Sequence, residues 1–308
     1  MSTIEDAKRL YRSGGIRSLP SGVVYYLLKE GPTANFTKRI LGSTLHQKCL
    51  VYPSLGYWPQ IENPQTFNEK ILHRKLRTSD DRLATVEGKI TAREYAADRI
   101  GDDKLPEVYH VTDNPEEIPF ESFPEEYVIK PTHMAGEVIF AEKGETPDHA
   151  AIKERCKQWL NADYGYIRNQ YWNADIDRQV MVEERLSDPE FDVPIDYKMY
   201  VFHGNVEYIH IDFDRFGSPS RRFFDRDWNA LDFRKGELPL GPAIEKPNQF
   251  EEMIATAETL GADFDFIRVD LYNLEDQEIL FGELTSCPAS GMTPFHPQSY
   301  DHEFGSLW

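Results

Sequence analysis

The fold is decided by Phe266-Ile-Arg-Val-Asp-Leu-Tyr272, which is followed by Ile279-Leu-Phe-Gly-Glu-Leu-Thr285. Both runs are rich in apolar and β-branched residues, and the first carries polar side chains at alternate positions, which predicts two strands. The acidic segment between them, residues 273–278, is typical of a hairpin turn. A hairpin would bring Glu283 close to Asp270, because residues opposite each other on paired strands are neighbours.

One face of this hairpin is expected to carry an unusual group of charges. Alternation along the first strand puts Arg268 on the same face as Asp270. Two carboxylates and a guanidinium together are costly unless a cation lies between the acids and an anion lies against the arginine. A magnesium–nucleotide complex supplies both charges. The other interpretation of these residues is an ion-pair network on a solvated sheet face.

The composition is that of a globular protein with two or three lobes around a large core. The chain has 308 residues, of which 40% are hydrophobic and 13% aromatic. No apolar run approaches the roughly 18 residues needed to cross a bilayer. Acids and a lysine precede the first apolar stretch, which argues against a secretory signal. The three cysteines are widely separated and lack metal-type spacing, so a reducing, cytoplasmic compartment is expected.

Charge is distributed unevenly along the chain. The net charge of -19 would repel a nucleic-acid backbone, and it is also typical of a host with high internal salt. Residues 1–50 are the exception, because they hold eight basic and three acidic side chains around the apolar run Val23-Val-Tyr-Tyr-Leu-Leu28. This basic arm would either dock as a helix on the neighbouring acidic lobe or contact a membrane surface or a lipid-linked anion.

The remaining pattern mixes helices and strands. Thr66 followed by Glu69 is a capping box, which predicts a helix that runs through Leu76 or Arg77. Strands are expected over 127–130, 137–140 and 178–183, a hairpin over 197–211, and further helices over 91–100, 148–160 and 247–260. This order predicts the α+β class, with an N-terminal lobe, a small middle lobe and a C-terminal antiparallel sheet.

Three lysines are candidates for contact with phosphate. Lys130 ends an apolar strand and precedes the bend Pro131-Thr-His-Met-Ala-Gly136, where a point charge and exposed amides could hold a phosphate. The spacing does not match a P-loop. Lys89 and Lys198 could contribute, or each could be an ordinary surface lysine. The strand end Val182-Glu-Glu-Arg-Leu186 could meet an adenine edge and a ribose, or be simply a charged strand end.

Several short motifs occur in a fixed order: Pro64-Gln-Thr-Phe-Asn-Glu-Lys-Ile71, Ile129-Lys-Pro131, Asp196-Tyr-Lys198, Phe202-His-Gly204 and the two strands quoted first. In this order the chain resembles the ATP-grasp ligases and, more narrowly, the TupA-like ATP-grasp proteins of the teichuronopeptide-biosynthesis type. The resemblance runs from about residue 50 to Gly305. It implies an ATP-grasp fold, with the nucleotide held between a small middle lobe and a C-terminal antiparallel sheet lobe.

The domain organisation that follows is a basic arm over 1–50, an N-terminal lobe over 51–105, a middle ATP-grasp lobe over 106–186 with the phosphate-binding bend, and a catalytic ATP-grasp lobe over 187–308. The resemblance also implies roles for residues at matching positions. ATP would be bound by Lys89, Lys130, His133, Gly136, Glu183, Glu184, Leu186 and Lys198. Mg²⁺ would be bound by Asp270, Glu283 and Thr285, and Arg268 and Lys198 would be catalytic.

The activity that the resemblance implies is ATP-dependent ligation of a carboxylate to an amine through an acylphosphate, which leaves ADP and phosphate. The expected context is a cell-surface polysaccharide precursor whose sugar acid receives an amino acid or peptide, at the inner face of the membrane. Alternatives are a phosphotransferase that uses the same nucleotide site and a non-catalytic scaffold for polysaccharide assembly.

The chain departs from the usual ATP-grasp pattern at three positions. The bend is His133-Met-Ala-Gly136 rather than His-Gly-Ser-Gly, which leaves one glycine to supply backbone freedom. Gly88 stands before Lys89 where an aspartate is usual. Thr285 replaces an asparagine and is a weaker ligand, so a second metal ion is in doubt.

Overall fold

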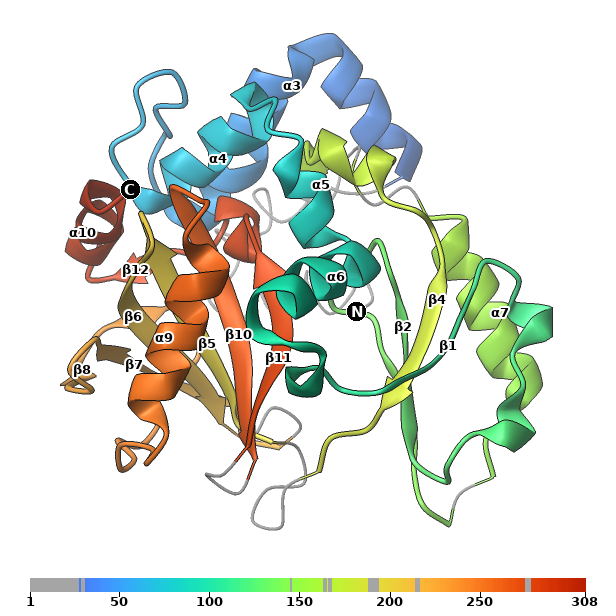
Figure 1. Ribbon diagram of the computed structural model, residues 1–308. Helices are drawn as coiled ribbons and strands as arrows, with labels where there is room; N and C mark the ends of the chain where they lie inside the picture. The colour runs from blue at the N-terminus through green and yellow to red at the C-terminus, as the bar shows by residue number, and fades with distance from the viewer. Residues whose placement is uncertain are drawn as a thin grey trace. The chain divides into compact units, whose positions relative to one another are not determined.

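The computed structural model describes residues 28, 31–144, 146–162, 165, 168–187, 194–213, 217–274 and 278–308 (Figure 1). Two compact units account for the chain. Unit 1 comprises residues 1–79, 165–171 and 287–308, and unit 2 comprises residues 80–164 and 172–286. The helix expected in the basic arm falls mostly outside the described residues. No described helix is both long and apolar enough to cross a membrane.

Unit 1 is mainly helical. Its elements are α3 (Gly31–Leu55), α4 (Phe67–Arg77), the 3₁₀ turn η6 (Pro288–Gly291), β12 (Phe295–His296) and α10 (Ser299–Ser306). The fully buried ring of Phe67 packs against Phe295, Phe304 and Trp308, with centroids 5.7–6.2 Å away. This aromatic cluster joins the start of α4 to the end of the chain.

The start of α4 is fixed by the predicted capping box. The hydroxyl of Thr66 accepts a hydrogen bond from the backbone N–H of Glu69 at 3.2 Å. The Glu69 carboxylate in turn accepts the N–H groups of Gln60, Gln65 and Thr66 at 2.7, 2.9 and 3.1 Å. Because both side chains are buried, these backbone donors depend on the box rather than on water.

Thr66→Ala is therefore expected to lower the free energy of unfolding by about 1 kcal/mol, the usual cost of losing a side-chain N-cap. Urea denaturation followed by circular dichroism measures the change. Thr78→Ala, at the other end of the helix where the backbone N–H makes the cap, is the matched control. A Thr66→Ala variant as stable as the control would contradict this account of the helix start.

Unit 2 contains a four-stranded sheet in the order β1-β4-β2-β3, built from β1 (Val108–Thr112), β2 (Tyr127–Pro131), β3 (Ile139–Ala141) and β4 (Val180–Glu184). All three pairings are antiparallel. Helix α7 (His149–Leu160) packs along this sheet (Figure 1). Their shared core includes Ile129, Trp159 and Val182. The connection over 113–124, with the turns η3 (Pro115–Glu117) and η4 (Phe120–Ser122), closes one side of it.

The second sheet of unit 2 has six antiparallel strands in the order β11-β10-β5-β6-β7-β8. They are β5 (Asp196–Phe202), β6 (Asn205–Phe213), β7 (Ser220–Asp225), β8 (Ala230–Leu231), β10 (Phe266–Leu274) and β11 (Glu278–Thr285). Helix α9 (Phe250–Gly261) covers one face (Figure 1). It approaches so closely that a side chain on Gly261 would meet Val201 at 2.5 Å. The polar side chains of β10 therefore face away from α9.

The predicted elements are present, and the α+β class with an antiparallel C-terminal sheet is confirmed. The β5–β6 hairpin turns at His203 and Gly204, both with positive φ, as a two-residue primed turn requires. The tip of the opening hairpin, residues 275–277, lies outside the described residues. Unit 2 also holds α5 (Arg82–Glu87), α6 (Lys89–Ile100), η2 (Asp102–Lys104), η5 (Tyr171–Asp175, of which Tyr171 belongs to unit 1) and β9 (Arg234–Lys235). Helix α6 begins two residues before the predicted start.

Candidate functional site

Unit 2 holds a cavity of about 400 Å³ between its two sheets. Its walls come from α5 and α6, from β2 and the bend that follows it, and from β4, β5, β10 and β11. Eleven of the twelve predicted site residues line it: Lys89, Lys130, His133, Gly136, Glu183, Glu184, Leu186, Lys198, Asp270, Glu283 and Thr285. The twelfth, Arg268, is hydrogen-bonded to the last three of these.

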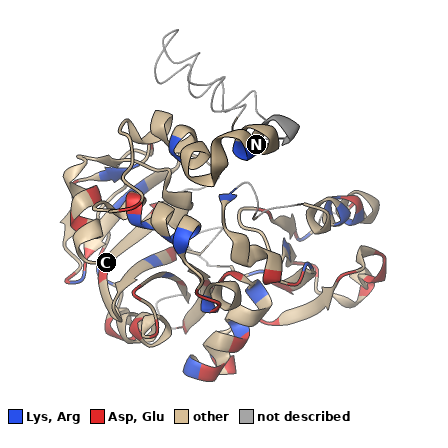
Figure 2. Cartoon of the chain, turned by 90° about the horizontal axis from the view of Figure 1, so that it is seen from above, with Lys and Arg blue, Asp and Glu red and all other residues tan. Residues whose placement is uncertain are grey.

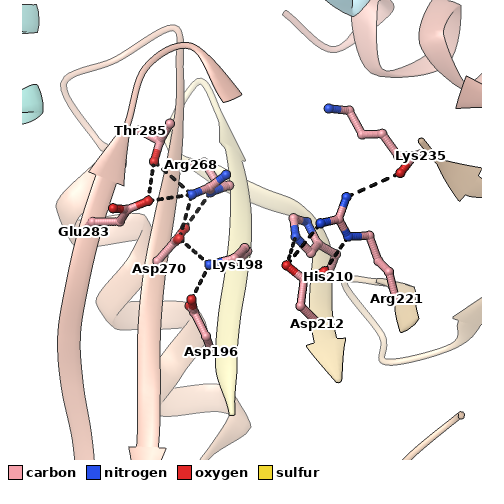
Figure 3. Close-up of polar contacts among 10 residues, drawn as sticks. All are labelled: Asp196, Lys198, His210, Asp212, Arg221, Lys235, Arg268, Asp270, Glu283 and Thr285. Atoms are coloured by element: carbon pink, nitrogen blue, oxygen red, sulfur yellow. Dashed lines mark hydrogen bonds and ion pairs between the residues drawn. The ribbon is translucent and has the colours of Figure 1, made fainter. Parts of the chain in front are cut away.

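Asp270 and Glu283 face each other across the β10–β11 ladder, as the hairpin predicts. The Arg268 guanidinium joins them (Figure 3). Its Nε and Nη2 donate to the two oxygens of Asp270 at 2.6 and 2.7 Å, and Nη2 also donates to Glu283 at 2.8 Å. The Thr285 hydroxyl accepts from Arg268 at 2.9 Å and donates to Glu283 at 3.0 Å. The cluster predicted from sequence is thus real, but Arg268 itself supplies the charge between the acids.

Lys198 extends the cluster along the sheet. It lies opposite Asp270 in the β10–β5 ladder, and its ammonium donates to Asp270 at 2.7 Å and more closely to Asp196. All three side chains are less than a tenth exposed. Lys198 is therefore a buried cation between two carboxylates, not an ordinary surface lysine. Asp196 belongs to the motif Asp196-Tyr-Lys198, but no role was predicted for it, although alternation places it on the same face as Lys198.

The electrostatics of the cluster follow from burial and charge pairing. Burial lowers the pKa of Arg268, but the negative charges of Asp270 and Glu283 raise it by more, so the guanidinium stays charged. Burial raises the pKa of Glu283, but the positive charges of Arg268, Lys198 and Lys89 lower it by more. The net shift of this pKa is therefore downward. Burial raises the pKa of Asp270 to about 6 against the opposing charges of Arg268 and Lys198. Because Lys89 also lowers the pKa of Glu283, it belongs to the same group of interacting charges as Lys198 and Arg268.

Lys130 and Glu183 pair across the β2 and β4 strands. The Lys130 ammonium donates to the Glu183 carboxylate, which is buried, and Arg93 on α6 approaches the same carboxylate at 3.7 Å. Glu183 therefore fixes two cations at the cavity wall. Arg93 was missed in the sequence, although it follows Lys89 by one helical turn and so shares its face of α6.

Lys89 occupies the first position of α6. Its ammonium donates to the carbonyl of Met134, so the lysine reaches the bend after β2. Burial lowers the pKa of Lys89, while Glu283 raises it. The half-buried Glu87, one position before Gly88, accepts the N–H of Ser286 at 2.8 Å. A side chain at position 88 would lie only 2.6 Å from the Thr91 hydroxyl, so the close packing here favours a glycine.

The bend after β2, residues 132–136, presents mainly backbone groups to the cavity. Gly136 has a φ of 81°, and a side chain there would meet nothing within 4 Å, so its backbone borders open space. His133 lines the cavity, but its ring is buried and Nε2 lies 3.1 Å from the Trp159 carbonyl. Burial, together with the charge of Arg178, lowers the pKa of His133, so its ring is neutral at pH 7.

The strand end after Glu183 borders the apolar part of the cavity. Glu184 is held by the backbone of Glu107, with hydrogen bonds of 2.8 and 3.2 Å, and Leu186 is half-buried. The apolar lining comes from Val128, Val138, Phe140, Met181, Phe281 and Leu284. These residues were not recognisable as site residues, because isolated apolar positions in strands are indistinguishable from core.

A second polar cluster lies on the next two strands of the same sheet. Asp212 accepts two hydrogen bonds from Arg221, at 2.5 and 3.0 Å, and lies 3.7 Å from the buried His210 (Figure 3). Arg222 pairs with Asp232 at 2.8 Å. Both arginines thus have carboxylate partners within the chain. Figure 2 shows that acidic and basic residues are also mixed along other described helices and strands.

The model of the TupA-like ATPgrasp family matches residues 69–308. Among solved structures, the ADP complex of N5-carboxyaminoimidazole ribonucleotide synthetase matches with a TM-score of 0.41 and 12% identity, over 67% of this chain and 46% of that one. D-alanine–D-alanine ligase from Bacillus anthracis, complexed with ATP, matches with a TM-score of 0.38 and 14% identity, over 66% and 55%.

The ATP-grasp ligase PsnB, complexed with a phosphomimetic precursor variant, Mg and ADP, matches with a TM-score of 0.37 and 12% identity, over 98% of this chain and 71% of that one. The chain spans about half the length of the first two structures. No curated protein matches the chain. The chain belongs to the TupA-like ATP-grasp family, since the family model covers well over half of its residues. The predicted resemblance is thereby confirmed.

Proposed function

We propose that this TupA-like ATP-grasp protein is an ATP-dependent ligase that activates a carboxylate as an acylphosphate and transfers the acyl group to an amine. The observation that carries the proposal is the cavity of unit 2. Three lysines (Lys89, Lys130 and Lys198) line it together with Asp270 and Glu283, and Arg268 is hydrogen-bonded to both of these carboxylates. Phosphoryl transfer requires mainly positioning and charge neutralisation from the protein, and this set of side chains supplies both.

ATP would lie along the cavity from its apolar part to the charged cluster. Adenine fits against Met181 and Phe281, with the backbone after Glu183 available to its edge. Lys89 and Lys130 would hold the α- and β-phosphates, with Gly136 leaving the bend backbone open to them. Lys198 would approach the γ-phosphate. A cavity of about 400 Å³ falls within the range of small-ligand sites, roughly 300–1,000 Å³.

The donor set of the acidic cluster fits Mg²⁺. The Asp270 and Glu283 carboxylates and the Thr285 hydroxyl are hard oxygen ligands, the type that magnesium prefers. No group of three or more His, Cys, Asp or Glu side chains suited to a metal occurs in the described part of the chain, so phosphate oxygens and water would complete the coordination. Bound there, Mg²⁺ would neutralise charge on the transferring phosphate. Asp270 and Glu283 would then exchange part of their pairing with Arg268 for the ion.

Arg268 and Lys198 would be the catalytic side chains. The substrate carboxylate attacks the γ-phosphorus and ADP leaves, which gives an acylphosphate. The amine then attacks the acyl carbon and phosphate leaves, while the amine loses a proton. Arg268 is already held by three acceptors, so it could stabilise the oxyanion with little reorganisation. A water-poor cavity would protect the acylphosphate from hydrolysis.

The proposed substrates are an amino acid or peptide and a sugar acid of a cell-surface polysaccharide precursor, joined on the cytoplasmic side of the membrane. Contact with a membrane or a lipid-linked precursor through the first 50 residues is part of the proposal. The described part of α3 supports it, because Phe36 and Ile40 are exposed on either side of the exposed Arg39. Aromatic and aliphatic side chains mixed with cations suit an anionic lipid surface.

Measurement of ADP release tests the activity, with amino acids crossed against uronic acids. The proposal expects ADP release that requires both a carboxylate and an amine, with one amide formed per ADP. A phosphorylated product without any need for an amine would indicate a phosphotransferase. Mg-ATP that fails to bind in isothermal titration would favour the scaffold.

Lys130→Met is expected to weaken Mg-ATP binding about tenfold or more, because one charge-assisted contact to phosphate contributes roughly 1.5–3 kcal/mol. Glu183 would keep Arg93 as a partner, so the fold should persist. Isothermal titration calorimetry gives the Kd directly. Lys153→Met, which removes a lysine of the same unit that pairs with Glu116 outside the cavity, is the control. Equal Kd values for the two variants would contradict the phosphate role of Lys130.

A further inference from the structure

The cavity of unit 2 contains a carboxylate that the proposed chemistry does not use. Seven carboxylates line this cavity. Five of them form ion pairs with lysine or arginine side chains: Glu137, Glu183, Asp196, Asp270 and Glu283. Glu184 belongs to the proposed adenine end and accepts the N–H of Glu107 at 3.2 Å. The seventh, Glu87, forms no ion pair with any described residue.

One carboxylate oxygen of Glu87 is occupied and the other is not. Oε1 accepts hydrogen bonds from the backbone N–H of Ser286, at 2.8 Å, and from the Ser286 hydroxyl. No donor among the described residues reaches Oε2. Lys89 follows two positions later, but its ammonium donates to the Met134 carbonyl instead. A half-buried carboxylate without a cationic partner loses hydration that the chain does not replace, so Glu87 is suited to a cationic ligand.

A second acceptor without a partner lines the same cavity. Asn173 is 6% exposed, and its Nδ2 donates to the His133 carbonyl at 3.4 Å. Because a carbonyl only accepts, this contact assigns Oδ1 as the remaining acceptor of the amide. Oδ1 is buried and has no hydrogen-bond partner among the described residues. Such an acceptor is unusual in a folded protein, and it indicates a ligand that donates hydrogen bonds.

Backbone contacts join Glu87 and Asn173. The N–H of Lys89, two positions after Glu87, donates to the carbonyl of Thr132 at 3.0 Å. Thr132 is the first residue of the bend after β2, and Asn173 donates to the next residue, His133. Both acceptors therefore border the same bend of the cavity wall.

This part of the cavity is the end away from the proposed adenine position. The bend follows the last residue of β2, whereas Glu184 pairs with the first residue of that strand. Ser286, which binds Glu87, directly follows Thr285 of the acidic cluster. A group bound by the two acceptors would therefore lie near the proposed site of phosphoryl transfer, where the second substrate must enter.

We propose that Glu87 and Asn173 bind the ammonium group of the amine substrate, the amino acid or peptide of the ligation, an assignment that rests on the proposed function. An ammonium carries three donors and a positive charge, so it can donate to Glu87 Oε2 and Asn173 Oδ1 while it balances the carboxylate. The phosphates of ATP, which accept hydrogen bonds, do not suit this pair of acceptors. The site determines binding of the amine and adds no step to the reaction.

A comparison of a charged and an uncharged amine tests the site. Mg-ATP and glucuronate are supplied with each standard amino acid in turn, or with hydroxylamine, which is uncharged at neutral pH. The hydroxylamine nitrogen attacks the acylphosphate, loses a proton and displaces phosphate, which gives a hydroxamate. A natural protein that forms no hydroxamate would overturn the ligase proposal and this proposal with it. Hydroxamate without an amide from any amino acid would overturn only the ammonium site.

Glu87→Gln keeps the acceptor for Ser286 but replaces Oε2 by an amide donor. The KM for the amino acid that the natural protein uses best is expected to rise about tenfold or more, because a charge-assisted hydrogen bond is lost. The KM for ATP and the rate of hydroxamate formation should stay as in the natural protein, since neither depends on an ammonium. Asn173→Leu, which removes only the amide acceptor, should raise the amino acid KM about threefold.

Glu94→Gln is the matched control, because it removes an exposed carboxylate on α6 that does not line the cavity. This variant should keep the natural KM values. A Glu87→Gln protein with the natural KM for the amino acid would overturn the proposal. So would a Glu87→Gln protein that loses hydroxamate formation as strongly as amide formation, because that result would indicate a structural role for Glu87.

Discussion

Asp270→Asn is expected to reduce ATP turnover by about 10³-fold or more, since it removes both a proposed metal ligand and the shared partner of two buried cations. The same change is expected to destabilise the protein. Arg268 and Lys198 would lose the carboxylate that accepts from both, and breaking a buried ion pair costs roughly 3–5 kcal/mol. Coupled assays of ADP release and urea denaturation measure the two effects on one preparation.

If Asp270 and Glu283 simply repelled each other, removal of one charge would stabilise the protein. The structure instead gives each acid a bond to Arg268, so the cluster is held together by attraction. Asp232→Asn, whose carboxylate pairs with Arg222 but is 88% exposed, should change stability by less than about 0.5 kcal/mol. Normal turnover by a folded Asp270→Asn protein would rule out the metal assignment.

Lys75→Met is expected to remove a large pH dependence of stability. The pKa of Lys75 in the folded protein is about 7, below the ordinary value of 10.5, because burial disfavours its charge and Arg168 and Lys38 repel it. Between pH 7 and pH 10.5 the unfolded chain therefore binds one proton that the folded protein does not bind. The free energy of unfolding should therefore rise with pH across this window, by about 5 kcal/mol in total.

Urea denaturation at pH 6.5, 8 and 9.5, in buffers without phosphate or carboxylate, measures this slope. The Lys75→Met variant should be more stable than the natural protein at pH 6.5, with the difference shrinking as the pH rises. Lys48→Met should keep the natural slope, since its lysine is only half-buried. Parallel curves for the natural protein and Lys75→Met would mean that Lys75 is charged and paired in the folded state.

Much of the fold could be predicted because local signals agreed with the final structure. The Thr66–Glu69 box, the alternation along β10 and the primed turn at Gly204 each specify local geometry through a few neighbouring residues. The antiparallel β10–β11 pairing followed from the two apolar runs and the acidic turn segment between them, and with it the approach of Glu283 to Asp270. The family resemblance then extended the prediction from elements to an ATP-grasp arrangement.

The remaining site features depend on contacts that sequence does not encode locally. That Arg268 would bind both acids, rather than an anion, depends on a side-chain conformation inside the sheet ladder. The pairing of Arg93 with Glu183 joins a helix to a strand 90 residues away. Lys75 looked like any lysine on an amphipathic helix, and only packing of the residues after β11 reveals that it is buried.

The most direct test of the central claim is a crystal structure of the protein with Mg²⁺ and a non-hydrolysable ATP analogue. The account predicts triphosphate density in the cavity of unit 2, within hydrogen-bonding reach of Lys130 and Lys198, and an ion bound by Asp270 and Glu283. A nucleotide bound elsewhere, or that cavity without nucleotide at concentrations well above the Kd from calorimetry, would contradict it.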